Sequence, residues 1–243
     1  RLSFIPELLY EHKISDLNNL TVGVRINYAR TNNNYSQDIM KKDHSDSYDI
    51  LSYAQLLGRY KNLSYQIGVG GNIVSYSKDS ISYTKRFMRP MIKFSYTPIS
   101  HFTFTFNAEL IPHVPELADM ANVTRKLNSI EIEKGNPDLR PYVEYNNKFD
   151  VAYNINRLYF QLAYLYSFSR HPFAPNSYID NGNIYYITDE YNKSRVHALS
   201  SFVNYEVIRN WLTLSGACTF SKTLFQKDNI EYTKNIWNYY VQA

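Results

Sequence analysis

Apolar and polar residues alternate one by one through most of this sequence. In the stretch FTFTFNAEL, Phe102 to Leu110, three phenylalanines occupy every second position, and Thr103 and Thr105 lie between them. A period of two places successive side chains on opposite faces of an extended strand, whereas an amphipathic helix needs a period near 3.6. The stretch therefore predicts a β-strand with one aromatic face and one polar face.

The alternation recurs along the whole chain and is interrupted by polar breaks of two kinds. Short breaks fall near residues 15–19, 61–62, 97–100, 156–157 and 209–210, and longer ones near 31–46, 77–82, 111–140, 170–193 and 222–230. Short and long breaks alternate along the chain, as in an antiparallel up-and-down meander whose short turns lie at one end. We expect an all-β chain of about eleven strands, roughly 10–12. Because no Pro-, Gly- or Ser-rich linker divides it, we expect residues 1–243 to form a single β-barrel segment.

The aromatic face of these strands needs an apolar neighbour, which is either another protein layer or lipid. Many of the strands hold about ten alternating residues, twice the usual length in soluble proteins. Ten residues span about 33 Å, and a tilt of about 40° leaves about 25 Å of height, which matches the apolar band of outer-membrane barrels. Charged residues on the polar face, such as Glu144, Lys148 and Asp150, suit a wet lumen better than a dry core.

Tyrosine is the most unusual feature of the composition, with 24 residues in the chain. Several tyrosines fall near the expected strand ends, where the aromatic girdles of a membrane barrel lie: Tyr28, Tyr65, Tyr96, Tyr145, Tyr153, Tyr166 and Tyr205. The pattern favours a transmembrane β-barrel. A soluble or surface-exposed β-rich module that binds glycans stays open as the alternative.

Charge and motif content argue against several other functions. The chain has 26 Lys+Arg and 22 Asp+Glu, a net charge of +4, and no basic run that would mark a nucleic-acid partner. Cys218 is the only cysteine, so no internal disulfide can form, and the alternation places it on the apolar face. The six histidines lack metal-ligand spacing, and no nucleotide-binding or hydrolase motif occurs. We expect no catalytic residue, no metal and no cofactor.

One long break contains a motif that resembles a family. The stretch PHVPELADMANVTRKLNSIEIEKGNPDLRPY resembles the TonB-dependent outer-membrane receptors, especially the barrel family abundant in Bacteroidetes. The residues that carry the resemblance are Arg89 and Pro90, Pro115 and Leu117, and then Gly135, Asn136, Pro137, Leu139 and Pro141. From the residues alone we expect the last five to be structural: Gly135 and Asn136 permit a positive φ at a tight reversal, and the prolines hold the chain extended toward the next strand.

The resemblance implies a function and a set of partners. Such receptors sit in the outer membrane of Gram-negative bacteria, hold a plug inside a 22-stranded barrel, and import a scarce nutrient of siderophore, glycan or peptide type. An energy-coupling protein drives this import, and a surface lipoprotein is a further partner that the resemblance suggests. The chain begins without Met and shows no plug and no energy-coupling box. With about eleven strands against the family's 22, the resemblance implies a fragment that corresponds to about half of a large transmembrane β-barrel, in contact with outer-membrane lipid.

A small nutrient ligand would bind on the long loops of such a barrel. The loop SYIDNGNIYYITDEY holds Tyr178, Tyr185, Tyr186 and Tyr191 among Asp and Asn. Aromatic rings with polar neighbours suit sugars, peptides and aromatic chelates, so these four tyrosines are the candidate ligand-binding residues. The competing interpretation is that they pack the loop against itself.

Overall fold

The computed structural model describes residues 2–35, 41–78, 81–116, 119–120 and 124–242. The described residues form β-strands, turns and irregular segments, without a helix. The strands are β1 (Leu2–Phe4), β2 (Glu7–Ser15), β3 (Asn18–Tyr35), β4 (Lys41–Tyr60), β5 (Leu63–Lys78), β6 (Ile81–Met88), β7 (Met91–Ile99), β8 (Phe102–His113), β9 (Thr124–Lys126), β10 (Glu131–Lys134), β11 (Tyr142–Ile155), β12 (Leu158–Arg170), β13 (Phe173–Asp180), β14 (Asn183–Glu190), β15 (Lys193–Ile208), β16 (Leu212–Lys227) and β17 (Ile230–Gln242).

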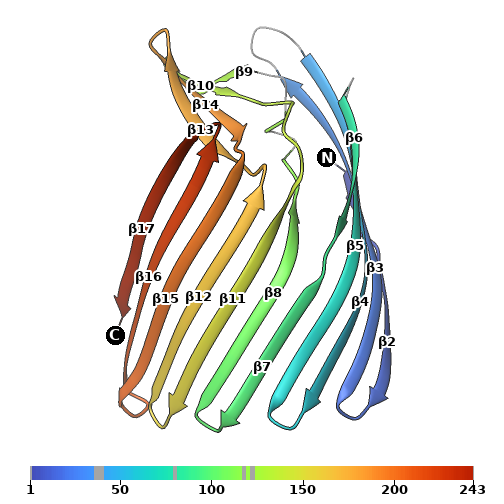
Figure 1. Ribbon diagram of the computed structural model, residues 1–243. Coiled ribbons are helices and arrows are strands. Elements are labelled where there is room, and N and C mark those ends of the chain that lie inside the picture. Colours follow the sequence, from blue (N-terminus) through green and yellow to red (C-terminus); the bar gives the residue numbers. More distant parts are fainter. Residues whose placement is uncertain (1, 36–40, 79–80, 117–118, 121–123, 243) are drawn as a thin grey trace.

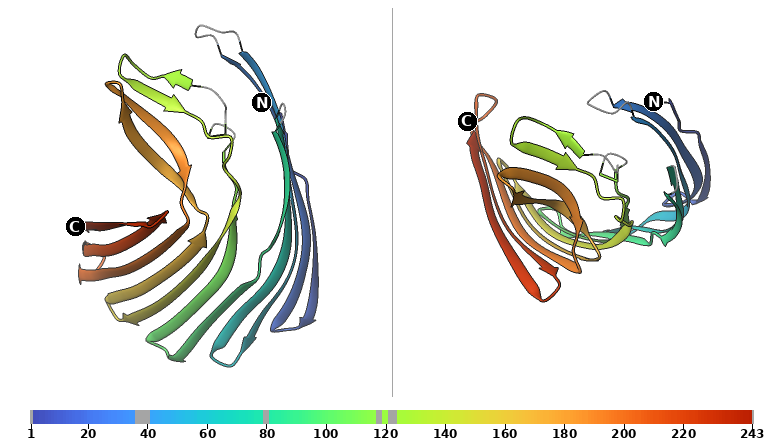
Figure 2. Two further views of the ribbon diagram at one scale, coloured as in Figure 1. Left: turned by 45° about the horizontal axis from the view of Figure 1, so that its top comes forward. Right: turned by 90° about the horizontal axis from the view of Figure 1, so that it is seen from above.

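Most strands belong to one curved, antiparallel sheet that forms an open arc (Figures 1 and 2). The order is β1-β3-β4-β5-β7-β8-β11-β12-β15-β16-β17, with β2 also paired to β3 and β6 also paired to β5. Pro6 and Pro90 lie where β1 gives way to β2 and β6 to β7, because proline has no N–H to give to the ladder. Each of these two pairs therefore makes one interrupted row, which gives eleven rows in the arc. The expected meander of about eleven strands is confirmed.

The two ends of the arc have different connections. Tight turns join β2 to β3, β4 to β5, β7 to β8, β11 to β12 and β15 to β16 at one end, as the sequence predicts (Figure 1). At the other end the longer connections fall where the sequence predicts them, but they contain strands that the alternation does not show: β3 and β4 extend through most of residues 31–46, and the 111–140 and 170–193 segments contain β9, β10, β13 and β14. Strands that project beyond the apolar zone need no apolar alternation, so a period-two search misses them.

The two faces of the arc differ sharply in chemistry. Across neighbouring strands Phe94, Phe106, Phe149, Tyr164, Leu199, Phe220 and Trp237 lie directly opposite one another and form a continuous apolar row. One residue along, on the other face, the row is Ser95, Thr105, Asp150, Ala163, Ser200, Thr219 and Asn238. Phe102 and Phe104 stack at 6.4 Å between ring centroids, and among the described residues no second sheet covers them on this face (Figure 2). The faces predicted from the alternation are confirmed.

The polar face is the concave one. Tyr76 shares a face with the inward Asn72 on β5 and packs against the long segment between β8 and β11, which lies inside the arc (Figure 2). The buried polar residues all lie on this face: Thr21, Asn72, Asp150, Ser167, Ser169 and Ser194. Asp150, for example, bonds to other polar residues of the concave face: it accepts from Lys148 on its own strand at 3.0 Å and from Gln161 on β12 at 3.1 Å. The convex face is left apolar and exposed.

Cys218 and the tyrosines near the strand ends lie on the convex, apolar face. Cys218 lies directly opposite Ser201 on β15 and Tyr239 on β17. It belongs to the same row across the convex face as Phe104 and Leu162. Tyr153, Tyr205 and Tyr96 lie toward the tight turns, and Tyr28, Tyr145 and Tyr166 toward the opposite end. Tyrosines therefore lie toward both ends of the convex face, as the sequence predicts.

Candidate functional site

A second, four-stranded sheet lies at the long-loop end of the arc. Its order is β13-β14-β10-β9, so it joins two long connections that are far apart in sequence. β10 runs parallel to β14, and the N–H of Ile184 donates to the carbonyl of Ile130 at 2.8 Å. Viewed from above, this sheet lies over the concave side of the arc (Figure 2). It can therefore contact anything that passes from the outside into the concave space.

Two of the four candidate tyrosines form an aromatic platform on one face of this sheet. Tyr178 and Tyr185 are directly opposite each other, and their rings stack with 5.0 Å between centroids and 6° between planes. The same row continues across the sheet with Ile132 on β10, which is buried, and Lys126 on β9. Tyr178 is 42% exposed. Stacked rings with phenolic hydroxyls and a nearby ammonium group offer a flat apolar contact together with hydrogen-bond partners.

Tyr186 points to the opposite face of the same sheet. It is adjacent to Tyr185, so the strand period turns it away from the platform. Its hydroxyl donates to Glu131 at 3.0 Å, and this hydrogen bond, with the negative charge of Glu131, raises the pKa of Tyr186. On this face Arg125 also pairs with Glu133 at 2.5 Å. Tyr186 therefore has a partner within the sheet.

Tyr191 lies at the junction with the barrel wall. Its ring contacts that of Phe225 at 5.1 Å, and the Lys227 ammonium lies 5.9 Å from the ring centroid. Burial, together with the charge of Asp189, raises the pKa of Tyr191. The structure thus divides the four tyrosines among a platform, the opposite face and a junction. It does not bring them into a single site.

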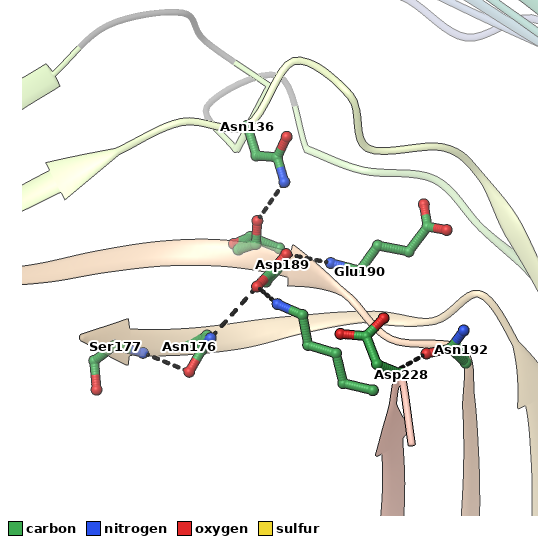
Figure 3. Close-up of polar contacts among 9 residues, drawn as sticks. Asn136, Asn176, Ser177, Asp189, Glu190, Asn192 and Asp228 are labelled. Atoms are coloured by element: carbon green, nitrogen blue, oxygen red, sulfur yellow. Dashed lines mark hydrogen bonds and ion pairs between the residues drawn. The ribbon is translucent and has the colours of Figure 1, made fainter. Parts of the chain in front are cut away.

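A polar network that no sequence pattern predicts holds this junction together (Figure 3). Asp189 on β14 pairs with Lys227 at the end of β16 and accepts from Asn176 on β13 at 3.4 Å. The N–H of Asp228 donates to the Asn192 side chain at 2.6 Å. These contacts tie the base of the second sheet to the end of a barrel strand.

Asn136 ties the long connection between β8 and β11 to β14. Its amide donates to the carbonyl of Thr188 at 3.1 Å, and the Thr188 hydroxyl donates to Asp119 at 2.8 Å. The expected positive φ at Gly135 and Asn136 is wrong, since neither residue has one. The bend is made instead by the Asn136 side chain, which accepts from the N–H of Asp138 at 3.1 Å.

The rest of the motif packs on the inner wall. Leu139 is 2% exposed and forms a buried cluster with Met120 and Tyr76, beside Tyr83 and Phe173. Pro137, Leu139 and Pro141 line a cavity of about 320 Å³ against β6. Pro115 is buried, and Leu117 lies outside the described residues.

A further depression of about 350 Å³ occupies the concave wall below this cluster. Its charged lining comes from Glu7, Arg25, Arg89 and Glu109, and Tyr53 reaches across to Glu7 at 3.3 Å. The absence of a side chain at Gly23, directly opposite Tyr53, leaves room for the tyrosine ring. Within the described ranges, no three His, Cys, Asp or Glu side chains come together as a metal site would require. In the same part of the chain, no helix is long and apolar enough to cross a membrane.

Solved structures with a similar fold include transporters and receptors. The chain is similar to the copper transporter OprC (TM-score 0.74, 10% identity, 91% of this chain and 37% of that one). It is similar to the FrpB iron transporter from Neisseria meningitidis (0.64, 12%, 94% and 37%) and to a mutant of the ferric enterobactin receptor PfeA from Pseudomonas aeruginosa, bound to enterobactin (0.62, 10%, 97% and 41%). At these identities the likeness concerns the fold. The chain spans less than half the length of each of these proteins.

The exposed apolar band, the polar concave face and these matches define the class: a segment of a large transmembrane β-barrel of the outer membrane. The family model described as the outer membrane protein beta-barrel family matches residues 7–243, and the chain belongs to that family. No curated protein matches the sequence. The barrel fold of a TonB-dependent receptor, predicted from the GNPDLRP motif and the alternation, is confirmed, and the chain belongs in the Gram-negative outer membrane.

Proposed function

We propose that this chain is the barrel portion of an outer-membrane receptor that takes up a scarce nutrient of siderophore, glycan or peptide type. The observation that carries the proposal is the second sheet, which lies over the concave side of the arc and presents the platform of Tyr178 and Tyr185. Outer-membrane barrels have short periplasmic turns and longer extracellular loops, so this sheet faces the outside. A captured ligand would lie above the polar lumen.

The remaining parts of the receptor come from beyond residues 1–243, which we propose to be one barrel segment. The arc ends in two strands, β2 and β17, that pair on one side only among the described residues. Free strand edges are not tolerated in hydrocarbon, so further strands must complete the wall. A plug inside the barrel, an energy-coupling protein and a surface lipoprotein are the further partners of this proposal, and the Bacteroidetes-type motif supports it.

The polar lumen and the compared proteins support transport over catalysis. The compared structures are of transporters and receptors. The polar groups on the concave face, such as Lys148, Asp150 and Gln161, bond to one another as a wall network does. The proposal therefore assigns binding to the loops and passage to the lumen, and gives no residue a catalytic role.

A binding experiment with a matched control tests the proposal. The complete polypeptide, purified from outer membranes, is titrated calorimetrically with ferric siderophores, oligosaccharides and short peptides. Replacing Tyr178 and Tyr185 together by Ala should weaken binding of the preferred ligand roughly tenfold. Tyr186→Ala is the control, because Tyr186 has similar exposure on the same sheet but faces the other way.

Deleting the gene should also abolish high-affinity uptake of that ligand by cells. Two results would contradict the proposal: unchanged uptake after deletion, or equal losses of binding for the platform and control variants. Unchanged uptake would reject the proposed receptor function, and equal losses of binding would reject the platform as the ligand site.

A further inference from the structure

A cavity of about 690 Å³ lies at the short-turn end, between the β11–β12 turn and the β15–β16 turn. Its apolar lining comes from Ile155, Leu158 and Tyr205, which follow one another across three strands on the convex face. Its charged lining comes from Arg157, Arg209 and Glu206. The cavity therefore opens where the apolar band of the barrel meets the periplasmic water layer.

The two turns hold the cavity in a fixed shape. The N–H of Glu206 donates to the carbonyl of Arg157 at 3.0 Å, which links one turn to the other. The Glu206 carboxylate accepts from the N–H of Asn210 at 2.6 Å, so it is engaged within its own turn. Asn156 and Asn210 both have a positive φ, which asparagine tolerates in tight reversals.

The cationic groups of the cavity differ from others at this end of the barrel. Lys13 pairs with Asp16 at 2.6 Å, and Arg59 donates to the carbonyl of Lys61 at 3.1 Å. Neither Arg157 nor Arg209 makes an ion pair within the described ranges. Two guanidinium groups against one carboxylate leave the cavity with a net positive charge. Beside it, Trp211 is 78% exposed, as expected for an aromatic anchor at the membrane surface.

We propose that this cavity binds the phosphate group of a glycerophospholipid in the periplasmic leaflet. Arg157 and Arg209 would donate to the phosphate oxygens, because guanidinium groups match phosphate geometry with paired hydrogen bonds. Ile155, Leu158 and Tyr205 would contact the first part of the acyl chains, which rise along the convex face. The lipid thus fills the gap between two turns and fixes the depth of the barrel in the membrane.

Native mass spectrometry of the complete polypeptide in detergent measures the binding directly. The probe is dioleoylphosphatidylglycerol, compared with dioleoylglycerol, which has the same chains and no phosphate, and with inorganic phosphate. Replacing Arg157 and Arg209 together by Gln should weaken phosphatidylglycerol binding about 30-fold, since each cation near an anionic lipid contributes roughly fivefold. Arg59→Gln with Lys61→Gln, at a neighbouring turn outside the cavity, should change it less than about twofold.

A second variant gives a change in the opposite direction. Glu206→Gln removes the negative charge and keeps an acceptor for Asn210, so phosphatidylglycerol should bind more tightly. The heat-induced mobility shift of folded barrels on gels checks that each variant is folded, and Glu206→Gln decides the matter if the double Arg variant fails to fold. The proposal is overturned if dioleoylglycerol binds as well as the phospholipid, if inorganic phosphate alone binds as tightly as the phospholipid, or if Glu206→Gln weakens binding.

Discussion

Replacing Phe106 by Arg would place a charge on the convex face near the middle of the membrane. Phe106 lies directly opposite Phe94 and Phe149, and it is 40% exposed. From Phe102, in the lowest phenylalanine row, to Phe106 the strand rises about 13 Å, which a tilt of about 40° reduces to roughly 10 Å of height. The apolar band of such barrels is about 25 Å tall, so Phe106 lies close to its midplane.

At that depth an arginine destabilises the folded barrel by about 2–4 kcal/mol. This change lowers the folding equilibrium constant roughly 30- to 900-fold. The measurement unfolds the complete polypeptide in urea and refolds it in lipid vesicles, with the folded fraction read from the heat-induced shift on gels. The midpoint should fall in proportion to the loss of free energy.

Thr105→Arg is the matched control, one residue away on the concave face. Thr105 lies opposite Asp150, and its hydroxyl is 3.4 Å from that of Ser95. An arginine there enters the polar lumen beside a carboxylate, so the free energy of unfolding should change by less than about 0.5 kcal/mol. Equal losses for the two variants would refute the assignment of lipid to the convex face.

Three smaller effects follow from the long-loop end. Leu139→Ala should destabilise the buried cluster by about 2–5 kcal/mol and speed protease cleavage of residues 111–140, whereas Leu127→Ala, at an exposed position, should not; equal cleavage rates would contradict this. Asp189→Asn removes the ion pair with Lys227, so hydrogen exchange in β14 should rise about fivefold, and unchanged exchange would mean that the pair does not hold the sheet. The hydrogen bond to Glu131 raises the pKa of Tyr186, so its stabilising effect is fully present below pH 10 and is lost as pH rises through the raised pKa of the folded state. Glu131→Gln should therefore lower the pKa of Tyr186 measured by ultraviolet titration, and an unchanged pKa would contradict the contact.

The barrel wall was predictable because each strand repeats one simple rule. Phe102, Phe104 and Phe106 must share a face of any strand, and hydrocarbon accepts such a face without a second protein layer. The tight turns at Asn156 and Asn210 were visible as short polar breaks. Neighbour-to-neighbour pairing then follows, because each hairpin joins strands that are adjacent in sequence.

The second sheet could not be predicted in the same way. Its parallel pairing of β10 with β14 brings together connections about 50 residues apart, from Glu131 and Ile184, which no local pattern encodes. The aromatic loop was correctly noticed as a candidate, but the alternation of β14 already separates Tyr185 from Tyr186. The partnership of Asp189 with Lys227 depends on the ends of two strands meeting, and single charged residues in polar breaks give no sign of it.

The most direct test of the account is a spin-label scan of β8 from Phe102 to Leu110 in the complete polypeptide, reconstituted in lipid vesicles. Each label reports its collisions with oxygen, which concentrates in lipid, and with a water-soluble nickel complex. We predict a period of two, with labels at Phe102, Phe104 and Phe106 accessible to oxygen and those at Thr103, Thr105 and Asn107 accessible to nickel. Protection of both sets from both probes would place the phenylalanines beneath another protein layer and contradict the membrane assignment.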